Sequence, residues 1–435
     1  MDRARVRLAV ALPVLAAALG TLRASEIVRT VALRPAAGVP EERAGQVIVA
    51  FRELDEADVE RAIRAAGGRS ARRSAFGERY LVEIPPEVGV PQAVSRFLAL
   101  PGVEYAEPNG TVRAHFRPND RLYERQWHLR LLRSERTWDI QRGDPSVIVA
   151  VLDTGVAYED FGPFRKAPDW GGTVFTPGFN VLDGSAHAND DNFHGTHVAS
   201  VIAEATDNGE GVAGLCFRCA ILPVKVLDNE GVGSFFDVAE GLDFAVSRGA
   251  KVVNMSLGGT GGSQALRQAV DRTVAGGAVV VASAGNDGVS SVEFPAALPN
   301  VIAVGAVDAR KQRASYSNFG ADLDVVAPGG DLDRDDDGNG EGDGVLQQTF
   351  SPDTAEDFGR YDDFAYYYVS GTSQAAPQVA ALAALLVRQG ITSPAAVKAA
   401  IESTAEDLGA TGRDDTFGHG LIRPEAALSG LGLNR

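Results

Sequence analysis

Hydrophobic and polar positions predict a small α+β domain in the N-terminal part of the chain. Residues 46–52 are rich in β-branched side chains, which favours a strand, and residues 56–66 carry apolar side chains at helical spacing until two glycines end the pattern. The same reasoning predicts strand 70–74, strand 80–84, helix 90–100 and strand 103–106. The resulting order β-α-β-β-α-β is the split βαβ pattern of a ferredoxin-like domain.

A second pattern begins near Pro118, where glycine becomes frequent and apolar stretches alternate with helical ones. The apolar stretches predict buried strands at 147–152, 220–226, 252–254, 279–283 and 301–307. Helices are predicted at 196–205, 236–248, 372–388 and 394–403. Buried strands that alternate with helices predict an α/β domain with a parallel sheet covered on both faces. In such domains the functional groups gather at the carboxyl ends of the strands.

The first residues have the pattern of an export signal. Several arginines within residues 2–7 precede an apolar stretch at 8–19 and then small residues, which is typical of a secretory signal peptide removed after Gly20 or Ala24. The apolar stretch is short for a membrane span, no later stretch has that character, and no cysteine lies near the cleavage sites to carry a lipid. We therefore expect a secreted protein, extracellular or periplasmic, without a membrane anchor.

Charge and cysteine content narrow the class of protein. The net charge of −17 argues against nucleic-acid partners, because the phosphate backbone would repel the chain. The two cysteines are Cys216 and Cys219. A redox pair would need a strand feeding a helix, and a zinc site would need two more ligands nearby. In an exported protein the favoured interpretation is a small disulfide that closes one surface loop.

Three separated segments carry groups suited to nucleophilic catalysis. Asp153 ends a buried apolar strand, where a partly desolvated carboxylate needs hydrogen-bond partners. His194 lies just before a predicted helix, and Ser373 opens a later helix, whose N-terminus stabilises negative charge. A serine hydroxyl needs a base within reach, and that base needs a partner that fixes its tautomer. The oxyanion needs fixed donors, for which Asn286 at the end of another strand is a candidate.

These blocks, in the order Asp, His, Ser, resemble the subtilisin-like serine protease family, the subtilases. The blocks that carry the resemblance are VLDTG, HGTHVA, AGNDG and SGTSQAAP. The resemblance implies a subtilisin-like parallel sheet flanked by helices, preceded by a small α+β ferredoxin-like propeptide domain. It divides the chain into a signal peptide at 1–24, a linker at 25–43, an inhibitory propeptide at 44–116 and a catalytic domain at 117–435.

The resemblance also implies a role for each residue of the site. Asp153 would orient His194, which acts as the general acid and base. Ser373 would form the acyl-enzyme, and Asn286 would join the Ser373 N–H in the oxyanion hole. A substrate peptide would pair as an added strand between two segments of the enzyme. The residues expected to bind substrate are Gly231, Gly233, Phe235 in the S4 pocket, Ser256, Leu257, Gly258 and Glu293.

Processing and specificity are further expectations from the resemblance. The propeptide would inhibit the enzyme until cleavage after Phe116, because cleavage one residue later would place Pro118 after the scissile bond. Glu293 lies in a segment that resembles the floor of the S1 pocket, where its charge would favour Lys or Arg at P1. A Glu293 side chain that points to solvent is the alternative. The expected partners are polypeptide substrates and the chain's own propeptide, with the enzyme a monomer.

Two acidic loops are candidates for structural calcium, because hard cations select oxygen ligands. The first is an acidic, glycine-rich run that matches only the start of a calcium loop, and a solvated loop is the alternative. Its expected ligands are Asp333, Asp335, Asp337 and Asp343. The second resembles a calcium loop of the family, and a plain turn is the alternative. Its expected side-chain ligands are Asn208, Glu210 and, from elsewhere in the chain, Asp169.

Two other functions are alternatives to a protease. A catalytically inactive subtilase homologue would act as a binding or scaffold protein, but the four candidate catalytic side chains are all present. An esterase of the α/β-hydrolase type would need a Gly-x-Ser-x-Gly turn at the nucleophile and the order Ser, acid, His, and the chain has neither. We therefore expect a secreted serine endopeptidase that works through an acyl-enzyme and is autoprocessed from a proenzyme.

Overall fold

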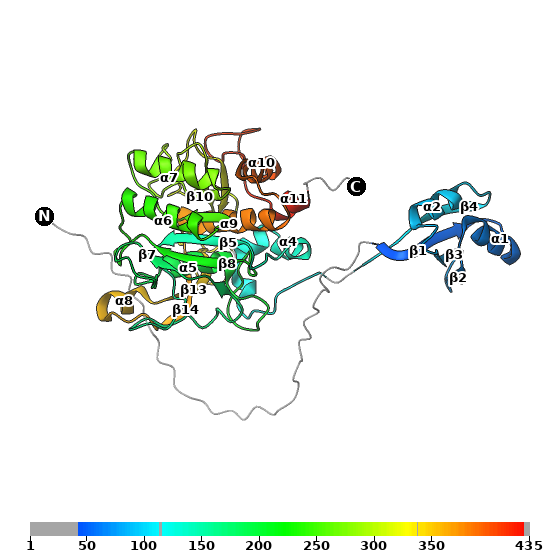
Figure 1. Ribbon diagram of the computed structural model, residues 1–435, viewed down its shortest axis with the longest axis horizontal. Helices are drawn as coiled ribbons and strands as arrows, with labels where there is room; N and C mark the ends of the chain where they lie inside the picture. The colour runs from blue at the N-terminus through cyan, green and yellow to red at the C-terminus, as the bar shows by residue number, and fades with distance from the viewer. Residues whose placement is uncertain (1–41, 113–114, 337, 430–435) are drawn as a thin grey trace, which may run out of the picture. The chain divides into compact units, whose positions relative to one another are not determined.

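The computed structural model describes residues 42–112, 115–336 and 338–429, which form a small N-terminal domain and a larger domain (Figure 1). The expected signal peptide lies outside the described residues, as does the expected linker up to residue 41. Strand β1 already begins at Glu42, two residues before the expected start of the propeptide at residue 44.

The N-terminal domain is an antiparallel sheet with two helices. Its elements are β1 Glu42–Phe51, α1 Glu56–Ala66, β2 Ser70–Arg73, β3 Arg79–Glu83, α2 Val90–Leu98 and β4 Val103–Gly110. The strands lie in the order β2-β3-β1-β4, and neighbours are antiparallel. Val47 and Val49 of β1 point to one face, where they share a core with Ile63 of α1 and Phe97 of α2. The predicted order β-α-β-β-α-β is confirmed.

The larger domain is built on an eight-stranded sheet. Its strands are β5 Ile148–Asp153, β6 Val174–Phe175, β7 Phe179–Asn180, β8 Ala220–Lys225, β9 Val252–Met255, β10 Val279–Ser283, β11 Val301–Val307 and β12 Val325–Pro328. They lie in the order β12-β11-β10-β9-β5-β8-β6, with β7 also on β8, and the pairs are parallel. The predicted parallel α/β sheet is confirmed. Strand β5, which ends at Asp153, lies inside the sheet between β9 and β8.

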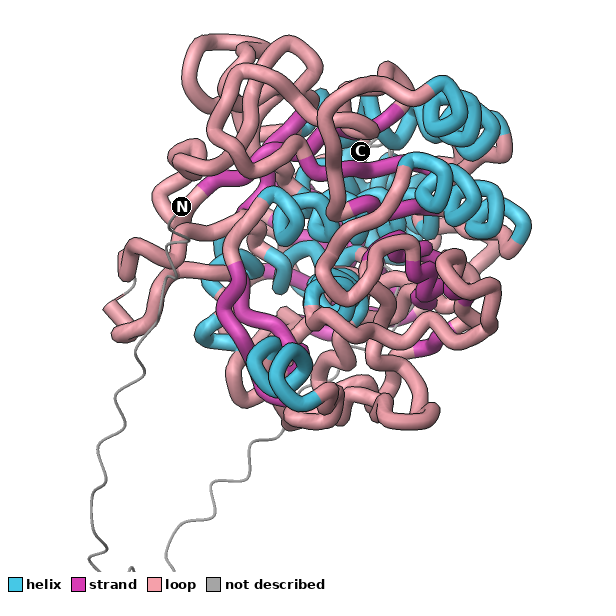
Figure 2. Tube along the Cα trace, turned by 90° about the vertical axis from the view of Figure 1, so that its left-hand side faces the viewer, coloured by secondary structure: helices cyan, strands magenta, loops and turns pink. Residues whose placement is uncertain are grey.

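Helices cover both faces of this sheet. They are α3 Trp127–Leu131, α4 Ser134–Ile140, α5 His194–Ala203, α6 Phe235–Ser247, α7 Gln264–Ala275, α9 Thr372–Arg388, α10 Pro394–Thr404 and α11 Pro424–Ser429, with a 3₁₀ turn at Tyr123–Arg125. Strands β6 and β7 precede α5 in the chain, so α5 connects this edge of the sheet back to β8, and α6 connects β8 to β9. Both α5 and α6 pack on β5 and β8. Helix α9 packs on α5 and α7 packs on α6, which leaves the strands between two helical layers (Figure 2).

A hairpin that the sequence analysis did not predict also belongs to the larger domain. Strands β13 Val345–Phe350 and β14 Phe364–Val369 pair antiparallel, and α8 Pro352–Phe358 connects them. Two glutamines of β13 are buried: Gln347 donates to the carbonyl oxygen of Ala213 at 3.1 Å, and Gln348 donates to Glu204 at 2.9 Å. Because these inward-facing side chains are polar, the strand lacks the hydrophobic pattern by which buried strands are recognised.

Two further observations concern the expected disulfide and the search for a membrane span. A disulfide joins Cys216 to Cys219 immediately before β8, with the Cα atoms 5.5 Å apart. Among the described residues, no helix is both long enough and apolar enough to cross a membrane.

Candidate active site

Asp153 and His194 form a hydrogen-bonded pair at the carboxyl end of β5. Asp153 is fully buried, and His194 is the first residue of α5 rather than the residue before it. Asp153 Oδ1 lies 2.7 Å from His194 Nδ1 and accepts the backbone N–H of Thr154 at 2.7 Å. Burial lowers the pKa of His194, but the charge and hydrogen bond of Asp153 outweigh burial and raise that pKa above its ordinary value. The carboxylate holds the ring through Nδ1, which leaves Nε2 as the nitrogen that exchanges a proton with a reacting group.

Buried Asp190 shapes the turn that leads into α5. Its Oδ1 accepts the Thr154 hydroxyl at 2.8 Å and the Phe193 N–H at 3.1 Å, and its Oδ2 accepts the N–H and hydroxyl of Thr196 at 2.9 and 2.6 Å. These bonds hold Phe193 at a φ of 105°, which is an unfavourable conformation for a residue with a side chain. Asp190 was not predicted from the sequence, because it lies before the N-cap position and its partner Thr154 comes from a distant segment.

Lys225, the last residue of β8, connects three segments of the site. Its ammonium group is buried and donates to the carbonyl oxygens of Thr154 and Leu227, at 2.8 and 2.6 Å, and to Asp191 Oδ1 at 2.7 Å. Thr154 follows Asp153, and Asp191 lies in the turn that leads into α5. One buried cation therefore fixes the strand end that carries the carboxylate, the turn before the histidine and the chain at Leu227. Lys225 was not predicted from the sequence either, because its partners come together only in the fold.

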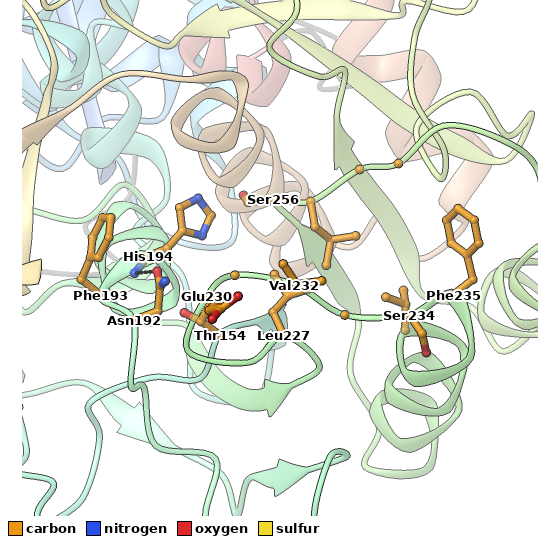
Figure 3. A pocket seen from close by; sticks show the side chains of 16 residues that line it. Thr154, Asn192, Phe193, His194, Leu227, Glu230, Val232, Ser234, Phe235 and Ser256 are labelled. Carbon is orange, nitrogen blue, oxygen red and sulfur yellow. Dashed lines mark hydrogen bonds between the residues drawn. The ribbon is translucent and has the colours of Figure 1, made fainter. Parts of the chain in front are cut away.

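Ser373 lies in the first turn of α9 and is joined to Ser256 by two hydrogen bonds. The Ser373 hydroxyl donates to the carbonyl oxygen of Ser256 at 3.2 Å, and the Ser256 hydroxyl donates to the carbonyl oxygen of Ser373 at 2.7 Å. Ser256 follows β9 and lines the same cleft as His194 (Figure 3). Among the described side chains, the Ser373 hydroxyl is bonded to Ser256 and not to the His194 ring.

Asn286 follows β10 and is oriented by Thr372, the residue before Ser373. Its Oδ1 accepts both the N–H and the hydroxyl of Thr372 at 2.9 Å. The amide nitrogen Nδ2 is then the donor end of this side chain, and a Cβ added to Gly371 would lie 3.7 Å from it. A fixed amide donor beside a serine at a helix N-terminus is an arrangement that stabilises an oxyanion.

A cleft of about 710 Å³ opens beside His194 (Figure 3). It brings together six residues that the sequence analysis expected to bind substrate: Gly231, Gly233, Phe235, Ser256, Leu257 and Gly258. Figure 3 shows the segment around Val232 facing the segment that begins at Ser256, with His194 at one end and Phe235 at the other. The cleft is also lined by residues that sequence analysis missed: Asn192, Phe193, Leu227, Glu230 and Val238. Two extended segments that face each other across a cleft suit a peptide in strand conformation.

Comparisons with known proteins agree with this geometry. A family model described as the subtilase family matches residues 144–420. The chain belongs to the subtilase family. A second model, the fervidolysin N-terminal prodomain, matches residues 39–109 of this subtilase. The subtilase is 37% identical over 377 residues to the thermophilic serine proteinase of Bacillus sp. (strain AK1), which covers 86% of this chain and 85% of that protein.

Further relatives show the same relationship. Thermitase of Thermoactinomyces vulgaris is 36% identical over 298 residues, which covers 68% of this chain and 94% of that protein. A solved structure described as a protease of Pseudoalteromonas arctica PAMC 21717 is 32% identical with a TM-score of 0.63, and the match covers 72% of this chain and 99% of that chain. This subtilase is therefore a serine endopeptidase preceded by a prodomain.

Glu293 of this subtilase lies against Gly258 and does not line the cleft as defined above. A Cβ on Gly258 would collide with Glu293 Oε2. Main-chain hydrogen bonds of 2.9 and 3.1 Å between Gly259 and Phe294 join the two segments. Burial raises the pKa of Glu293, and the carboxylate of Asp287 adds to the rise. The Glu293 carboxyl is thus partly desolvated beside a residue of the substrate-binding segment.

The loop after α5 brings two of the three expected calcium ligands into contact. Asn208 Nδ2 donates to Asp169 Oδ1 at 2.7 Å, and the Val212 N–H donates to Asp169 Oδ2 at 3.1 Å. Burial raises the pKa of Asp169, and the charge of the nearby Glu210 adds to the rise. The loop therefore holds carboxylates and an amide close together, whose oxygen atoms are ligands suited to calcium.

Asp120, which sequence analysis missed, lies beside the same loop. Its Oδ2 accepts the Asp207 N–H at 2.8 Å, and its Oδ1 is buried without a hydrogen-bond partner in the described part of the chain. Burial raises the pKa of Asp120 to about 7, and the charge of Asp169 adds to the rise. Burial also raises the pKa of the nearby Glu204 well above its ordinary value, with contributions from Asp169 and Asp120. Buried carboxylates that raise one another's pKa form a site that a cation would stabilise.

The acidic run at residues 331–343 is partly neutralised by arginines and backbone N–H groups. Asp335 accepts the N–H groups of Asn339 and Gly340, and Asp343 accepts the Asp336 N–H at 2.6 Å. Asp336 is also paired with Arg310 at 2.5 Å and Arg334 at 3.4 Å, and Asp333 is exposed. Asp337 lies outside the described residues. Within the ranges that the structure describes, no three or more His, Cys, Asp or Glu side chains are grouped to hold a metal ion.

Proposed function

We propose that this subtilase is an exported endopeptidase that cleaves itself from its prodomain and uses Asp153, His194 and Ser373 as its catalytic triad. The observation that carries the proposal is the 2.7 Å contact between Asp153 and His194, at one end of a cleft that Ser256 also lines. Ser256 is the residue to which the Ser373 hydroxyl is bonded. These contacts support a mechanism in which the carboxylate, the imidazole and the serine act on one peptide bound in the cleft.

The chemistry follows from this arrangement. A peptide binds in extended form between segments 231–233 and 256–258, so that its scissile carbonyl carbon lies over Ser373 Oγ. His194 Nε2 takes the proton of the hydroxyl as Oγ bonds to that carbon, and Asp153 stabilises the resulting imidazolium. The Ser373 N–H and Asn286 Nδ2 donate to the oxyanion. His194 then protonates the leaving amine, the C–N bond breaks, and water hydrolyses the acyl-enzyme by the same steps.

Kinetics of two serine variants from one segment test this proposal. Ser373→Ala should lower kcat on a peptide substrate by about 10⁶-fold, since the nucleophile is lost. Ser370→Ala, three residues earlier on the same segment, should keep kcat within about threefold because its hydroxyl has no part in the mechanism. If Ser373→Ala retains wild-type turnover, the site assignment is wrong. If the wild type has no turnover either, the chain is an inactive homologue that binds without cleaving.

The prodomain is proposed to inhibit the enzyme until it is removed. The support is the prodomain match at residues 39–109 together with a separately folded β-α-β-β-α-β domain. A peptide with the sequence of residues 42–112, added to the mature enzyme, should inhibit it competitively.

Export is proposed from the signal pattern of residues 1–24, and mass measurement of protein from the culture medium would check the loss of that segment. We also propose that the enzyme acts as a monomer, which light scattering would check.

Glu293 is proposed to favour Lys or Arg at P1. The support is its partly buried carboxyl beside Gly258, because a desolvated carboxylate pairs strongly with a cationic side chain. Structural calcium is proposed at Asp169, Asn208 and Glu210, with Asp120 as a further ligand. The support is the buried Asp120 Oδ1 without a partner and the raised pKa of Asp120. The acidic run is the weaker candidate, since arginines and backbone N–H groups already neutralise it.

A further inference from the structure

We propose that the mature protease retains Phe116 as the anchor of its N-terminal segment, so that the bond cleaved in maturation lies on the N-terminal side of Phe116. The inference rests on the proposed self-processing and replaces the expected boundary between residues 116 and 117. It concerns which bond the enzyme selects in its own chain. Its support comes from the packing of one aromatic ring and from the chain that follows it.

The Phe116 ring is part of the core of the catalytic domain. Its side chain is 2% exposed, stacks on Phe217 with centroids 5.9 Å apart, and meets the edge of Trp138 at 5.8 Å. The Arg142 guanidinium lies 4.1 Å from the ring centroid, which is within the range of a cation–π contact. The Phe116 N–H donates to Asp139 Oδ1 at 2.8 Å. Both the ring and the backbone of Phe116 are thus bound by residues of the catalytic domain.

The Phe116 ring lies in a socket formed by Trp138, Arg142 and Phe217. Phe217 lies inside the loop that the Cys216–Cys219 disulfide closes, so the disulfide restricts the position of the ring that stacks on Phe116. The chain between α4 and β5 passes directly over this bond at Gly143, where a Cβ would lie 2.6 Å from Cys216 Sγ. The rings that contact Phe116 are thus held in place by the disulfide and by the close approach of the chain at Gly143. Removal of Phe116 with the propeptide would leave this socket without its occupant.

The chain after Phe116 is fixed to the proposed calcium loop. Asn119 Oδ1 accepts the Gly209 N–H at 2.8 Å, and Asp120 Oδ2 accepts the Asp207 N–H at 2.8 Å. An anchor at Phe116 therefore holds Asp120 in position against the loop. A mature chain that began at Arg117 would keep these hydrogen bonds but would lose the only buried aromatic side chain of the segment 115–120.

Cleavage after Phe116 conflicts with this packing. A scissile bond between residues 116 and 117 requires the Phe116 side chain to occupy the S1 pocket and residues before it to pair with the cleft segments. Phe116 would then become the C-terminal residue of the propeptide and leave with it. Retention of Phe116 explains why the catalytic domain supplies a closed aromatic socket for this residue.

The mature N-terminus decides between the two boundaries. The full chain is expressed as wild type and as Ser373→Ala, and intact mass and N-terminal sequencing are determined for each. We expect the wild-type product to contain Phe116, while Ser373→Ala stays at the size of the proenzyme. A mature chain that begins at Arg117 or later overturns the inference. If neither protein is processed, self-processing is what fails, and the anchor is decided by the following measurement.

Limited digestion of the Ser373→Ala proenzyme with chymotrypsin tests the anchor without any activity of the enzyme. Phe76, 91% exposed in the turn between β2 and β3, is the internal control and should be cleaved early. The bond after Phe116 should resist until the catalytic domain unfolds, because its ring and N–H are bound. Cleavage after Phe116 as fast as after Phe76 contradicts the anchor.

Two phenylalanine variants give a matched measure of stability. Phe116→Ala should lower the unfolding midpoint of the mature enzyme by roughly 5–10 °C, since it empties a closed core position. Phe76→Ala should leave that midpoint unchanged, because Phe76 belongs to the prodomain that is removed. An unchanged midpoint in Phe116→Ala would show that the mature enzyme does not use this ring.

Discussion

Replacement of Lys225 by methionine removes a buried charge from the centre of the active site while keeping an unbranched side chain. The wild-type ammonium group is 5% exposed and has three partners at 2.6 to 2.8 Å: the carbonyl oxygens of Thr154 and Leu227 and Asp191 Oδ1. Methionine can satisfy none of them. We expect both the stability of the fold and the alignment of the catalytic groups to suffer.

The size of the effect follows from what is left behind. Asp191 keeps its charge but loses its partner, and breaking a buried pair in this way costs about 3–5 kcal/mol. The Asp191 side chain is 23% exposed, so water offsets part of the loss and the lower end, about 3 kcal/mol, applies. Burial raises the pKa of Asp191 while Lys225 lowers it, so Lys225→Met should raise this pKa further. Asp191→Asn keeps a hydrogen-bond acceptor for Lys225 and should cost about 1–2 kcal/mol.

Activity should fall as well, because Lys225 holds Thr154, the neighbour of Asp153, and Leu227, which lines the cleft. A misplacement of about 1 Å costs on the order of 10²-fold, so kcat/KM per titrated active site should fall by about 10–100-fold. Urea unfolding and peptide hydrolysis at 15 °C measure the two effects for Lys225→Met, Asp191→Asn and the double variant. Lys251→Met, an exposed lysine just before β9, is the matched control and should match the wild type.

The double variant separates the pair from its surroundings. Because the uncompensated charge is removed, it should be more stable than Lys225→Met alone by about 1–2 kcal/mol. The usual scatter of surface substitutions is about 0.5 kcal/mol. If the unfolding free energy of Lys225→Met lies within that scatter of the wild type, and its kcat/KM stays within about twofold, Lys225 does not connect the site as described.

Four further predictions concern other parts of the molecule. Asn286→Ala should lower kcat by about 10²–10³-fold with little change in KM, since its amide acts only on the oxyanion. A chelator should destabilise the wild type by about 2.7 kcal/mol relative to calcium at 100 times its Kd, and Asp120→Ala should abolish the difference between the two midpoints. Burial lowers the pKa of His128 to about 3, whereas a histidine in the unfolded chain has a pKa of about 6.5. The neutral ring therefore contributes full stability above the unfolded pKa, and this contribution is lost as the pH falls from the unfolded pKa towards the folded pKa. His128→Leu should therefore reduce the slope of unfolding free energy between pH 6 and 4 by about 1.4 kcal/mol per pH unit, and an unchanged slope would contradict the buried neutral ring. Glu293→Gln should lower kcat/KM for Lys at P1 about tenfold relative to Leu, and equal ratios in both enzymes would show that Glu293 does not face the P1 side chain.

Local sequence was sufficient for most of the elements and for the contact between Asp153 and His194. Strand β10 and helix α9 have the predicted bounds because each is a largely apolar segment that glycine or polar residues delimit. Asp153 and His194 could be placed close together because a residue at the carboxyl end of a parallel strand lies at the edge where ligands bind. Helix α7 was missed even though its buried positions, among them Leu266 and Val270, follow helical spacing.

The features that sequence could not supply depend on contacts between distant segments. Phe116 fits the sequence pattern of a residue before a cleavage site, but its burial comes from Trp138, Arg142 and Phe217. Asp120 has no local pattern of a ligand, since it meets its loop across 87 residues of chain. Lys225 is the last residue of the apolar strand β8, where a lysine ordinarily marks the return of the chain to solvent rather than a buried cation. In each case the role of the side chain depends on partners from distant segments, which only the fold brings together.

Labelling with a fluorophosphonate, followed by peptide mass mapping, tests the catalytic assignment most directly. The wild-type mature enzyme should take up one label per molecule, on Ser373, and His194→Ala and Asp153→Asn should each slow the labelling by at least about 10³-fold. A label on another residue, or rapid labelling of Ser373 in the variant that lacks the imidazole, would contradict the proposed triad.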